Sequence, residues 1–389
     1  MGFFGKATYN AGSDLPELVE DVSDLISIVS PFETPLLDRL GDSRNPATNT
    51  VHEWIEDTLL PNADTINQTT FTPNAQDATL ITVTNGSRFQ VGDMLRPGNA
   101  AEVMLVTGIV ANTLTVIRRY GGTPASALAN GLRISILGNP AIEGADATSA
   151  RFTNRSRRQN YSQIFAATVE VTGTMQAIKA RGIADEFEYQ KSERLRELLR
   201  DLENCVINGT APVSQPQGSP TTRRTMNGII RSIQTNQFTP GQGGFPAGGG
   251  AGAELNENLI NTALRQVWEQ SSSRVDTILV NGAQKRRINQ FISSTSRHYA
   301  PGDRKLSELV SIYESDFGAC NLILSRWVPA DTVLMIDSTR ISVMPLIGRS
   351  FHFKQLATTG DAVSGQVLGE YTMEMRNESA HGLIRGLTQ

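Results

Sequence analysis

Carboxylates are the first residues to weigh for chemistry in this sequence, because paired acids can transfer protons. Asp57, Asp64 and Asp77 lie within one polar stretch. Acid–base catalysis needs two such groups, or an acid and a nucleophile, held at a fixed short separation. No spacing in the sequence pairs these three. We therefore interpret them as solvated loop carboxylates and predict no catalytic residue.

The sequence also contains no motif typical of a metal site or a nucleotide-binding site. The two cysteines, Cys205 and Cys320, are far apart, and the four histidines are scattered along the chain. Zinc sites need several such ligands at short spacing. The glycine-rich segment 241–252 does not connect a strand to a tightly following helix, as phosphate-binding loops do. We predict a loop there, cysteines in the core, and neither a metal nor a cofactor.

Two clusters of like charge indicate a contact surface instead. Four arginines lie within residues 151–158, and the charged residues of segment 14–24 are all acidic. The arginines could contact nucleic-acid phosphate, pair with carboxylates of a neighbouring chain, or face solvent. Neither cluster has an evident partner in its own chain, so we favour contact between subunits. The candidates are Glu17, Glu20, Asp21 and Asp24 on one side, and Arg151, Arg155, Arg157 and Arg158 on the other.

The composition restricts the class of protein. The 389 residues carry a formal net charge of −4, with 39% hydrophobic and 19% charged residues. Those values exclude a wholly disordered chain and a bundle of membrane helices. A negative net charge argues against a protein that grips specific DNA sequences. The first residues contain no apolar core of signal-peptide length, so export is not indicated.

The elements that must position these residues begin with strands and one long helix. Residues 48–60 alternate as a strand does. Short β-rich runs, with turn residues roughly every ten positions, fill 78–140 and predict an inserted all-β module. Residues 183–207 predict the longest helix. Its expected apolar stripe includes Phe187, Leu195, Leu198 and Leu202, and its expected ion pairs are Glu188–Lys191, Glu193–Arg196 and Glu197–Arg200.

The second half of the chain mixes helices with strands. Residues 256–270 predict a helix capped by Asn256, and a buried strand at 276–281 precedes a helix that begins at Gly282. The remainder is β-rich, so we predict an α+β fold. In the last β-run, alternation places Tyr371, Met373 and Met375 on the side that packs on the long helix, and Thr372, Glu374 and Arg376 on the other.

Five phrases spread along the chain resemble one family. They are DLISIVSPFETPLLDRLGD at 24–42, VHEWIEDTL at 51–59, RDLENCVING at 200–209, TILVNGAQKRRINQF at 277–291 and GEYTMEMRNESAHGLIRGL at 369–387. The set resembles the SU-10-like branch of the major capsid proteins of tailed phages, which have the Hong Kong 97-type fold. The resemblance covers nearly the whole chain, and none of the phrases is a catalytic motif.

The resemblance implies a division of the chain into parts. Residues 1–47 would form an N-terminal arm, 48–77 and 141–180 an extended loop, and 78–140 an inserted all-β domain. A peripheral domain would be built around a spine helix at 183–207, and an axial domain would follow it. The expected bounds are 181–214 and 351–389 for the peripheral domain, and 215–350 for the axial domain.

It also implies a structural role without enzymatic activity. The chain would assemble with itself into pentamers and hexamers of an icosahedral head shell around double-stranded DNA, which it would contact loosely and non-specifically. Expected partners are portal, separate scaffold and decoration proteins, and no membrane. The expected location is the virion, after assembly in the bacterial host cytoplasm. We expect no covalent link between subunits, because no lysine lies between Lys6 and Lys179 to supply an isopeptide amine on the extended loop.

Two other interpretations stay open at this point. The shell protein of a cellular nanocompartment shares the fold, although such proteins are usually shorter and lack a β insertion. A β-rich enzyme acting on polysaccharide is of a different class, and the lack of a signal peptide and of paired carboxylates argues against it. Particle size separates shell from enzyme, because a shell protein forms megadalton particles.

Overall fold

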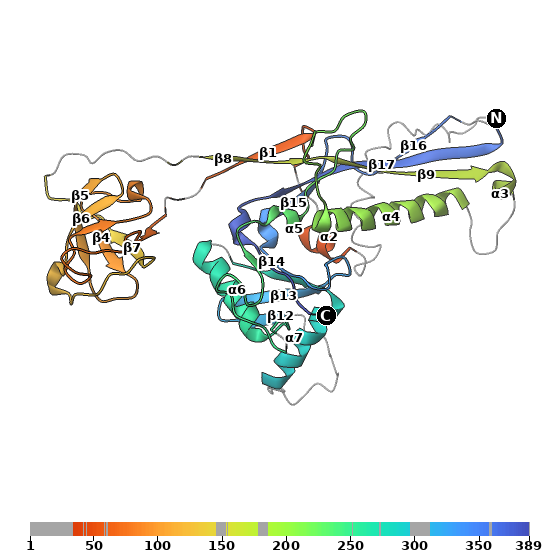
Figure 1. Cartoon of the computed structure of the whole chain (residues 1–389). Helices are drawn as coiled ribbons and strands as arrows, with labels where there is room; N and C mark the ends of the chain where they lie inside the picture. The colour runs from red at the N-terminus through yellow and green to blue at the C-terminus, as the bar shows by residue number, and fades with distance from the viewer. Residues whose placement is uncertain are drawn as a thin grey trace. The chain divides into compact units, whose positions relative to one another are not determined.

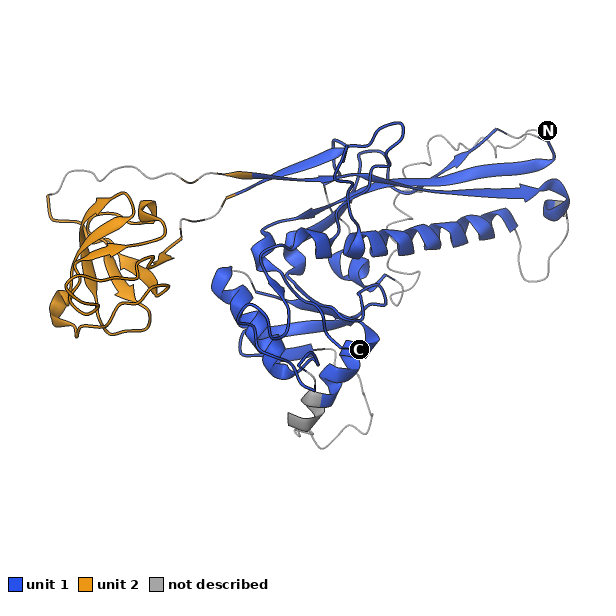
Figure 2. Cartoon of the chain, in the orientation of Figure 1, with its two compact units in different colours: residues 1–56, 157–389 blue, residues 57–156 orange. Residues whose placement is uncertain are grey.

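The computed structural model of the chain describes residues 34–41, 43, 45–57, 59, 61–144, 153, 155–177, 186–250, 252–271, 274–295, 312–357 and 360–388. Its contacts divide the chain into two compact units (Figure 2). Unit 1 comprises Met1–Glu56 and Arg157–Gln389, and unit 2 comprises Asp57–Ser156. Unit 2 therefore interrupts unit 1 in the sequence, as an insertion does.

Unit 2 is a six-stranded antiparallel barrel. The strands follow one another around it in the order β2, β7, β4, β5, β6 and β3. The barrel closes where β3 meets β2, because Ile66 bridges Val83 and the N–H of Asn67 donates to the carbonyl of Thr82 at 2.9 Å. The bounds are β2 (Ala63–Thr65), β3 (Leu80–Thr82), β4 (Met94–Pro97), β5 (Met104–Val110), β6 (Thr113–Ile117) and β7 (Arg133–Gly138), with single 3-10 turns at η1 (Gly86–Arg88) and η2 (Tyr120–Gly122).

The barrel has a core of its own. Ile81, Leu95, Met104 and Leu114 are completely buried inside it. The compact unit is wider than the 78–140 expected for it, because β2 pairs with β7. The three residues of β2 are too few to show the alternation that marks a strand in a sequence.

The described part of unit 1 contains a two-stranded sheet and two larger ones, and the first of the larger sheets lies on the longest helix (Figure 1). Its central strand, β17 (Ala362–Met375), pairs along one edge with β9 (Gln163–Thr172). The other edge of β17 pairs with β15 (Ile341–Pro345) and β16 (His352–Gln355). The helix, α4 (Glu186–Asn208), packs against β9 and β17. A five-residue helix, α3 (Gly173–Ala177), directly follows β9.

The spine helix is confirmed together with its apolar stripe. Leu195, Leu198 and Leu202 are buried in one cluster with Tyr371, Met373 and Met375, as expected. Phe187 is half-buried and its ring meets that of Phe353 edge-on at 5.6 Å. The expected pair Glu197–Arg200 is wrong, because Glu197 instead accepts from Arg194 at 2.6 Å, and Arg200 lies 3.7 Å from Asp201.

The opposite side of β17 is buried as well. Thr372 is fully buried and its hydroxyl donates to the carbonyl of Tyr161 at 3.1 Å. Glu374 is only 5% exposed and contacts His52. The side of β17 opposite α4 is therefore packed as well at these two positions. The reason is that β1 (Val51–Glu56) and β8 (Ser156–Tyr161), which pair as a two-stranded sheet, contact this face through His52 near the start of β1 and Tyr161 at the end of β8.

The second sheet of unit 1 has six strands and two long helices beside it. Its order is β10, β18, β14, β11, β13 and β12. Helix α6 (Glu257–Gln270) begins after Asn256, whose side chain accepts from the N–H of Leu259 at 2.9 Å, as predicted. The remaining bounds are β10 (Gln237–Phe238), β11 (Thr277–Val280), β12 (Ile312–Ser315), β13 (Gly318–Leu324), β14 (Val333–Ile336), β18 (Gly382–Ile384), α5 (Ile229–Ser232), α7 (Gly282–Thr295), η3 (Ser338–Arg340) and η4 (Glu378–Ala380).

Two strands near the C-terminus pair with a sheet outside the domain expected for them. β15 falls within 215–350 but pairs with β17, and β18 falls within 351–389 but pairs with β14. Short apolar strands carry no sign of which sheet they join, so the sequence could not place them. Within the described residues, no helix is long and apolar enough to cross a bilayer.

Candidate functional site

The predicted arginine cluster lies at the start of β8, opposite β1. Arg157 lies 3.4 Å from Glu53, and Arg158 lies 3.4 Å from Glu56. Our expectation that the cluster lacks a partner in its own chain is therefore wrong for these two arginines. Arg155 is exposed. Arg151 and the four acidic candidates, Glu17, Glu20, Asp21 and Asp24, lie outside the described residues.

Carboxylates fasten the two-stranded sheet of β1 and β8 to the end of β17. Glu56 accepts from the indole N–H of Trp54 at 3.0 Å and from the backbone N–H of Asn377 at 2.7 Å. Glu374 lies 2.7 Å from His52 and is also paired with Arg376. The hydrogen bond with His52, helped by Arg376, lowers the pKa of Glu374 against the effect of burial. These charged and hydrogen-bonded contacts, called the anchor below, attach β1 to the end of β17.

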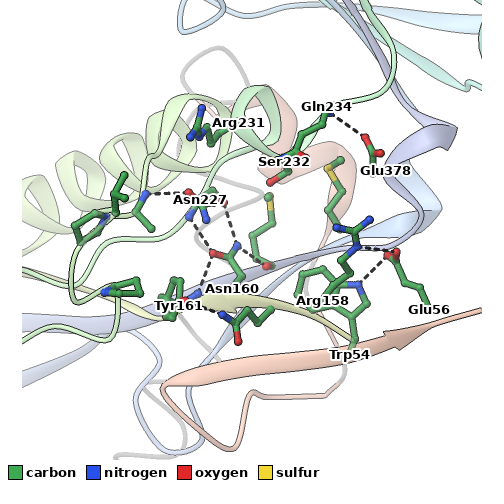
Figure 3. Close-up of a pocket in the computed structure, with 17 residues that line it drawn as sticks. Trp54, Glu56, Arg158, Asn160, Tyr161, Asn227, Arg231, Ser232, Gln234 and Glu378 are labelled. Carbon is green, nitrogen blue, oxygen red and sulfur yellow. Dashed lines mark hydrogen bonds and ion pairs between the residues drawn. The ribbon is translucent and has the colours of Figure 1, made fainter. Parts of the chain in front are cut away.

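A cavity of about 360 Å³ opens beside this anchor (Figure 3). Trp54 and Arg158 from the two-stranded sheet line it, with Arg231 on α5 and the methionines of β17. At its floor the side chain of Asn160 makes four hydrogen bonds: it donates to the carbonyls of Asn227 and Met373, and accepts from the N–H groups of Tyr161 and Asn227. A side chain with every polar position used holds the floor rigid.

Two further polar side chains of the cavity, Glu378 and Ser232, are bonded to the backbone. Glu378 accepts from the N–H groups of Gln234 and Thr235 at 2.9 and 3.1 Å, and the hydroxyl of Ser232 donates to the carbonyl of Gly228 at 2.8 Å. Burial would raise the pKa of Glu378, but the hydrogen bonds from Thr235 and Gln234 and the charge of Arg158 outweigh it and lower the pKa. The hydroxyl of Ser232 is bonded to a backbone carbonyl, which cannot act as a general base, so this wall is suited to packing rather than to catalysis.

Two buried glutamates, which the sequence analysis missed, hold the surrounding segments together. Glu370 is 3% exposed and lies between Arg224 at 2.6 Å and Arg349 at 2.8 Å. Glu203 is fully buried in the apolar stripe of α4. It accepts from the N–H groups of Leu36 and Leu37 at the start of the short helix α2 (Pro35–Leu40). The only sign of this role in the sequence was that Glu203 occupies a position within the apolar stripe of α4, and that sign is weak.

The cysteines lie where reactivity is low. Burial raises the pKa of both thiols, that of Cys320 to about 11, so the thiolate is scarce at neutral pH. Cys320 is 2% exposed, whereas Cys205 is half-buried and not fully in the core. In the part of the chain that the structure describes, no three His, Cys, Asp or Glu side chains come together as metal ligands do.

The family model described as SU10 major capsid protein matches residues 4–388. The chain belongs to this family. The capsid protein is 21% identical to the major capsid protein of Escherichia phage Phieco32 over 290 residues, which cover 64% of this chain and 82% of the relative. It is thus a major capsid protein of the tailed-phage, Hong Kong 97-type class, and its location is the virion. It is a structural protein of the head shell and not an enzyme.

Two solved structures align with this capsid protein at low sequence identity. Microbacterium phage Oxtober96 aligns with a TM-score of 0.44 and 15% identity, covering 76% of this chain and 87% of that one. The holo-SrpI encapsulin complex from Synechococcus elongatus PCC 7942 aligns with a TM-score of 0.41 and 12% identity, covering 61% and 79%. The family match confirms the capsid prediction over the nanocompartment and the polysaccharide-acting enzyme.

Proposed function

We propose that this capsid protein builds an icosahedral lattice of pentamers and hexamers, with its parts in the roles the resemblance implied. The layer of α4, β9 and β17 would be the peripheral domain, and the six-stranded sheet with α6 and α7 the axial domain. The two-stranded sheet of β1 and β8 would be the extended loop that reaches a neighbour. The packaged DNA would be contacted loosely, in keeping with the net charge of −4.

The observation that carries this proposal is apolar surface left open on unit 1. Ile55 on β1 is 69% exposed, Ile164 on β9 is 50% exposed, and Val213 at the rim of the cavity is 95% exposed. Large apolar side chains exposed on strands and loops are typical of surfaces that another protein covers. In a shell, that protein is a second copy of the same chain.

Assembly of the purified chain tests the proposal. We expect megadalton particles by size-exclusion chromatography and icosahedral shells by electron microscopy. Ile55→Glu should lower the particle yield at unchanged thermal stability, because its side chain is exposed in the single subunit. Leu80→Glu, at an exposed position of unit 2, is the matched control. Small oligomers only, from the native chain, would contradict the proposal.

The charged candidates belong to the same proposal. We infer that Glu17, Glu20, Asp21 and Asp24 of one subunit contact Arg155 and its neighbouring arginines on another. Because Arg157 and Arg158 already lie near Glu53 and Glu56, Arg155 is the sharper position to test. Arg155→Glu should lower the particle yield, and Arg155→Glu with Asp21→Lys should restore part of it. An unchanged yield from the single variant would contradict this contact.

A further inference from the structure

Most strand edges among the described residues are short or closed. The barrel of unit 2 has no free edge. In the six-stranded sheet of unit 1 the outer strands are β10, with two residues, and β12, with four. β16, which lies beyond β17 in the other sheet, also has four. Natural proteins keep edge strands short in this way because a long open edge pairs with other chains.

β9 departs from that rule. It has ten residues, all ten pair with β17, and no other described strand pairs with its outer edge. It contains no proline and one charged residue, Glu170. A long, straight edge without proline and with little charge is the kind that recruits another strand.

The register shows which backbone groups of β9 point outward. The N–H of Glu370 donates to Arg349, and its carbonyl accepts from Leu346, so both groups of Glu370 point away from β9. Its partner across the ladder, Ile164, must therefore direct its own N–H and carbonyl outward. The direction of the backbone groups alternates along a strand, so every second residue of β9 directs its N–H and carbonyl outward. These residues are Ile164, Ala166, Thr168, Glu170 and Thr172, and the side chains of all five are exposed.

A groove runs along this same edge. Its volume is about 380 Å³, and five consecutive residues of β9, 168–172, line it. Consecutive residues of a strand point to opposite faces, so a groove that touches all five follows the edge rather than a face. The opposite wall comes from one stripe of α4: Glu186, Gln190 and Arg194. The groove thus offers backbone groups on one side and a polar helix on the other.

We propose that the outer edge of β9 accepts an extended segment of a second copy of this chain as an added strand. The inference rests on the shell-forming role, because the neighbours of a shell subunit are copies of itself. An added strand would bond to the outward groups of Ile164, Ala166, Thr168, Glu170 and Thr172 and would occupy the groove beside α4. The ten-residue outer edge of β9, the longest open edge among the described strands, would then be covered only in the assembled shell.

Hydrogen exchange of free chain and assembled particles tests this without a mutation. The amides of residues 166, 168, 170 and 172 should exchange about a hundredfold more slowly in particles. The amides of 165, 167, 169 and 171 bond to β17 and should be protected in both states. Exchange is followed by fragmentation mass spectrometry after the particles are dissolved. A protection pattern of period two that appears only on assembly is the expected result.

A variant gives a second, independent readout. Thr168→Pro removes one outward N–H, while the bonds of Ala167 and Val169 to β17 remain. We expect the free chain to stay folded and the fraction assembled to fall about tenfold. Thr168→Val, which keeps the N–H and the β-branched shape, should assemble like the native chain.

The outcomes separate this inference from the proposed function. The inference would be overturned if particles form normally but the even-numbered amides of β9 exchange as fast in them as in the free chain. That result would not contradict the proposed shell lattice. A native chain that forms no particles would contradict the lattice proposal, and the inference with it.

Discussion

The carboxylate of Glu203, within the longest helix, accepts a hydrogen bond of 3.0 Å from the backbone N–H of Leu36, 167 residues earlier in the chain. The same carboxylate accepts from Leu37 at 2.9 Å. Arg39, on the same short helix, pairs with Asp276 at 3.1 Å just before β11. The residues that follow the acidic segment are thus held by both the spine helix and the second sheet.

This contact predicts a pH dependence. Burial raises the pKa of Glu203 from its ordinary 4.5 to about 7, although the two N–H groups oppose the shift. An acid whose pKa is raised by folding stabilises the fold fully below pH 4.5, and the contribution is lost as pH rises through 7. We expect the free energy of unfolding to lose about 3 kcal/mol from this group between pH 4.5 and pH 8.

Glu203→Gln isolates the effect, because the amide does not titrate. His381, whose pKa burial lowers to about 4, contributes in the opposite direction over a similar range. The quantity to measure is therefore the difference in unfolding free energy between native and Glu203→Gln chains, by denaturant titration at pH 4.5 and pH 8. A difference that does not change between those values would contradict the prediction.

Leu198 predicts the cost of charge in the spine contact. The side chain is 5% exposed and lies in the cluster that contains Met373. Leu198→Asp should destabilise the chain by about 3–5 kcal/mol and leave it insoluble or unassembled, because a carboxylate there has no partner. Tyr189→Asp, at a 44% exposed position of α4, is the matched control and should fold. Solubility and particle yield decide the matter, and normal particles from Leu198→Asp would refute the core assignment.

The barrel depends on one buried ion pair. Arg118 donates to both carboxylate oxygens of Glu102 at 2.7 Å, and the residues are 6% and 0% exposed at the side chain. Burial would raise the pKa of Glu102, but the hydrogen bonds from Arg118 and Ser126 outweigh it and hold the pKa at about 2. The pair should therefore persist in acid, and its contribution is lost only as pH falls from 4.5 through 2.

Removing one residue of the Glu102–Arg118 pair should lower the free energy of unfolding more than removing both. Glu102→Gln leaves the guanidinium buried without its counter-charge, and we expect a loss of about 3–5 kcal/mol at pH 7. The double variant Glu102→Met with Arg118→Met should recover part of that loss. Thermal unfolding of the full chain measures the loss of stability. Hydrogen exchange of residues 94–117 shows whether the loss is located in the barrel. Equal losses for single and double variants would contradict this account.

Ala111 predicts a stabilising substitution. It occupies the two-residue turn between β5 and β6 with a φ of 53°, in the left-handed region. Alanine is strained there, whereas glycine is not. Ala111→Gly should raise the unfolding free energy by about 0.5–1 kcal/mol. Ala101→Gly, at an exposed position without positive φ, should be neutral or destabilising, and the same result for both would show that strain is not the cause.

The shell is predicted to have no covalent cross-links. No lysine lies between Lys6 and Lys179, a range that includes the proposed extended loop, and the guanidinium of arginine stays protonated and cannot attack an amide. Mature particles should give one band near 42 kDa on denaturing electrophoresis. A ladder that survives reducing agent would overturn the claim.

Long periodic elements could be predicted from the sequence, and single polar residues in the core could not. The stripe of Leu195, Leu198 and Leu202 and the cap at Asn256 follow local rules that hold in any fold. Glu203 is bonded to Leu36, 167 positions away, and Glu370 to Arg224, 146 positions away, and no local pattern indicates those partners. Glu197 has an arginine three residues away on each side, Arg194 and Arg200. Its side-chain rotamer decides which of them it pairs with, and the sequence does not indicate that rotamer.

The contact candidates divide in the same way. The exposed character of Arg157 and Arg158 follows from their charge, but their pairing with Glu53 and Glu56 depends on the register of β1 against β8. Register is set by hydrogen bonds between segments about a hundred residues apart. Family membership could be recognised from phrases along the whole chain, because it did not depend on any one contact.

The closed barrel of unit 2 bears on how such shells diversify. Its chain leaves β1 and re-enters at β8, two strands that pair with each other, so the two junctions are joined through one sheet. A barrel without free edges can be gained or lost by recombination at that point, and neither the module nor its host is left with an unpaired strand. A genome could therefore exchange this module for a short hairpin or for another closed domain while the two larger sheets of the subunit stayed intact.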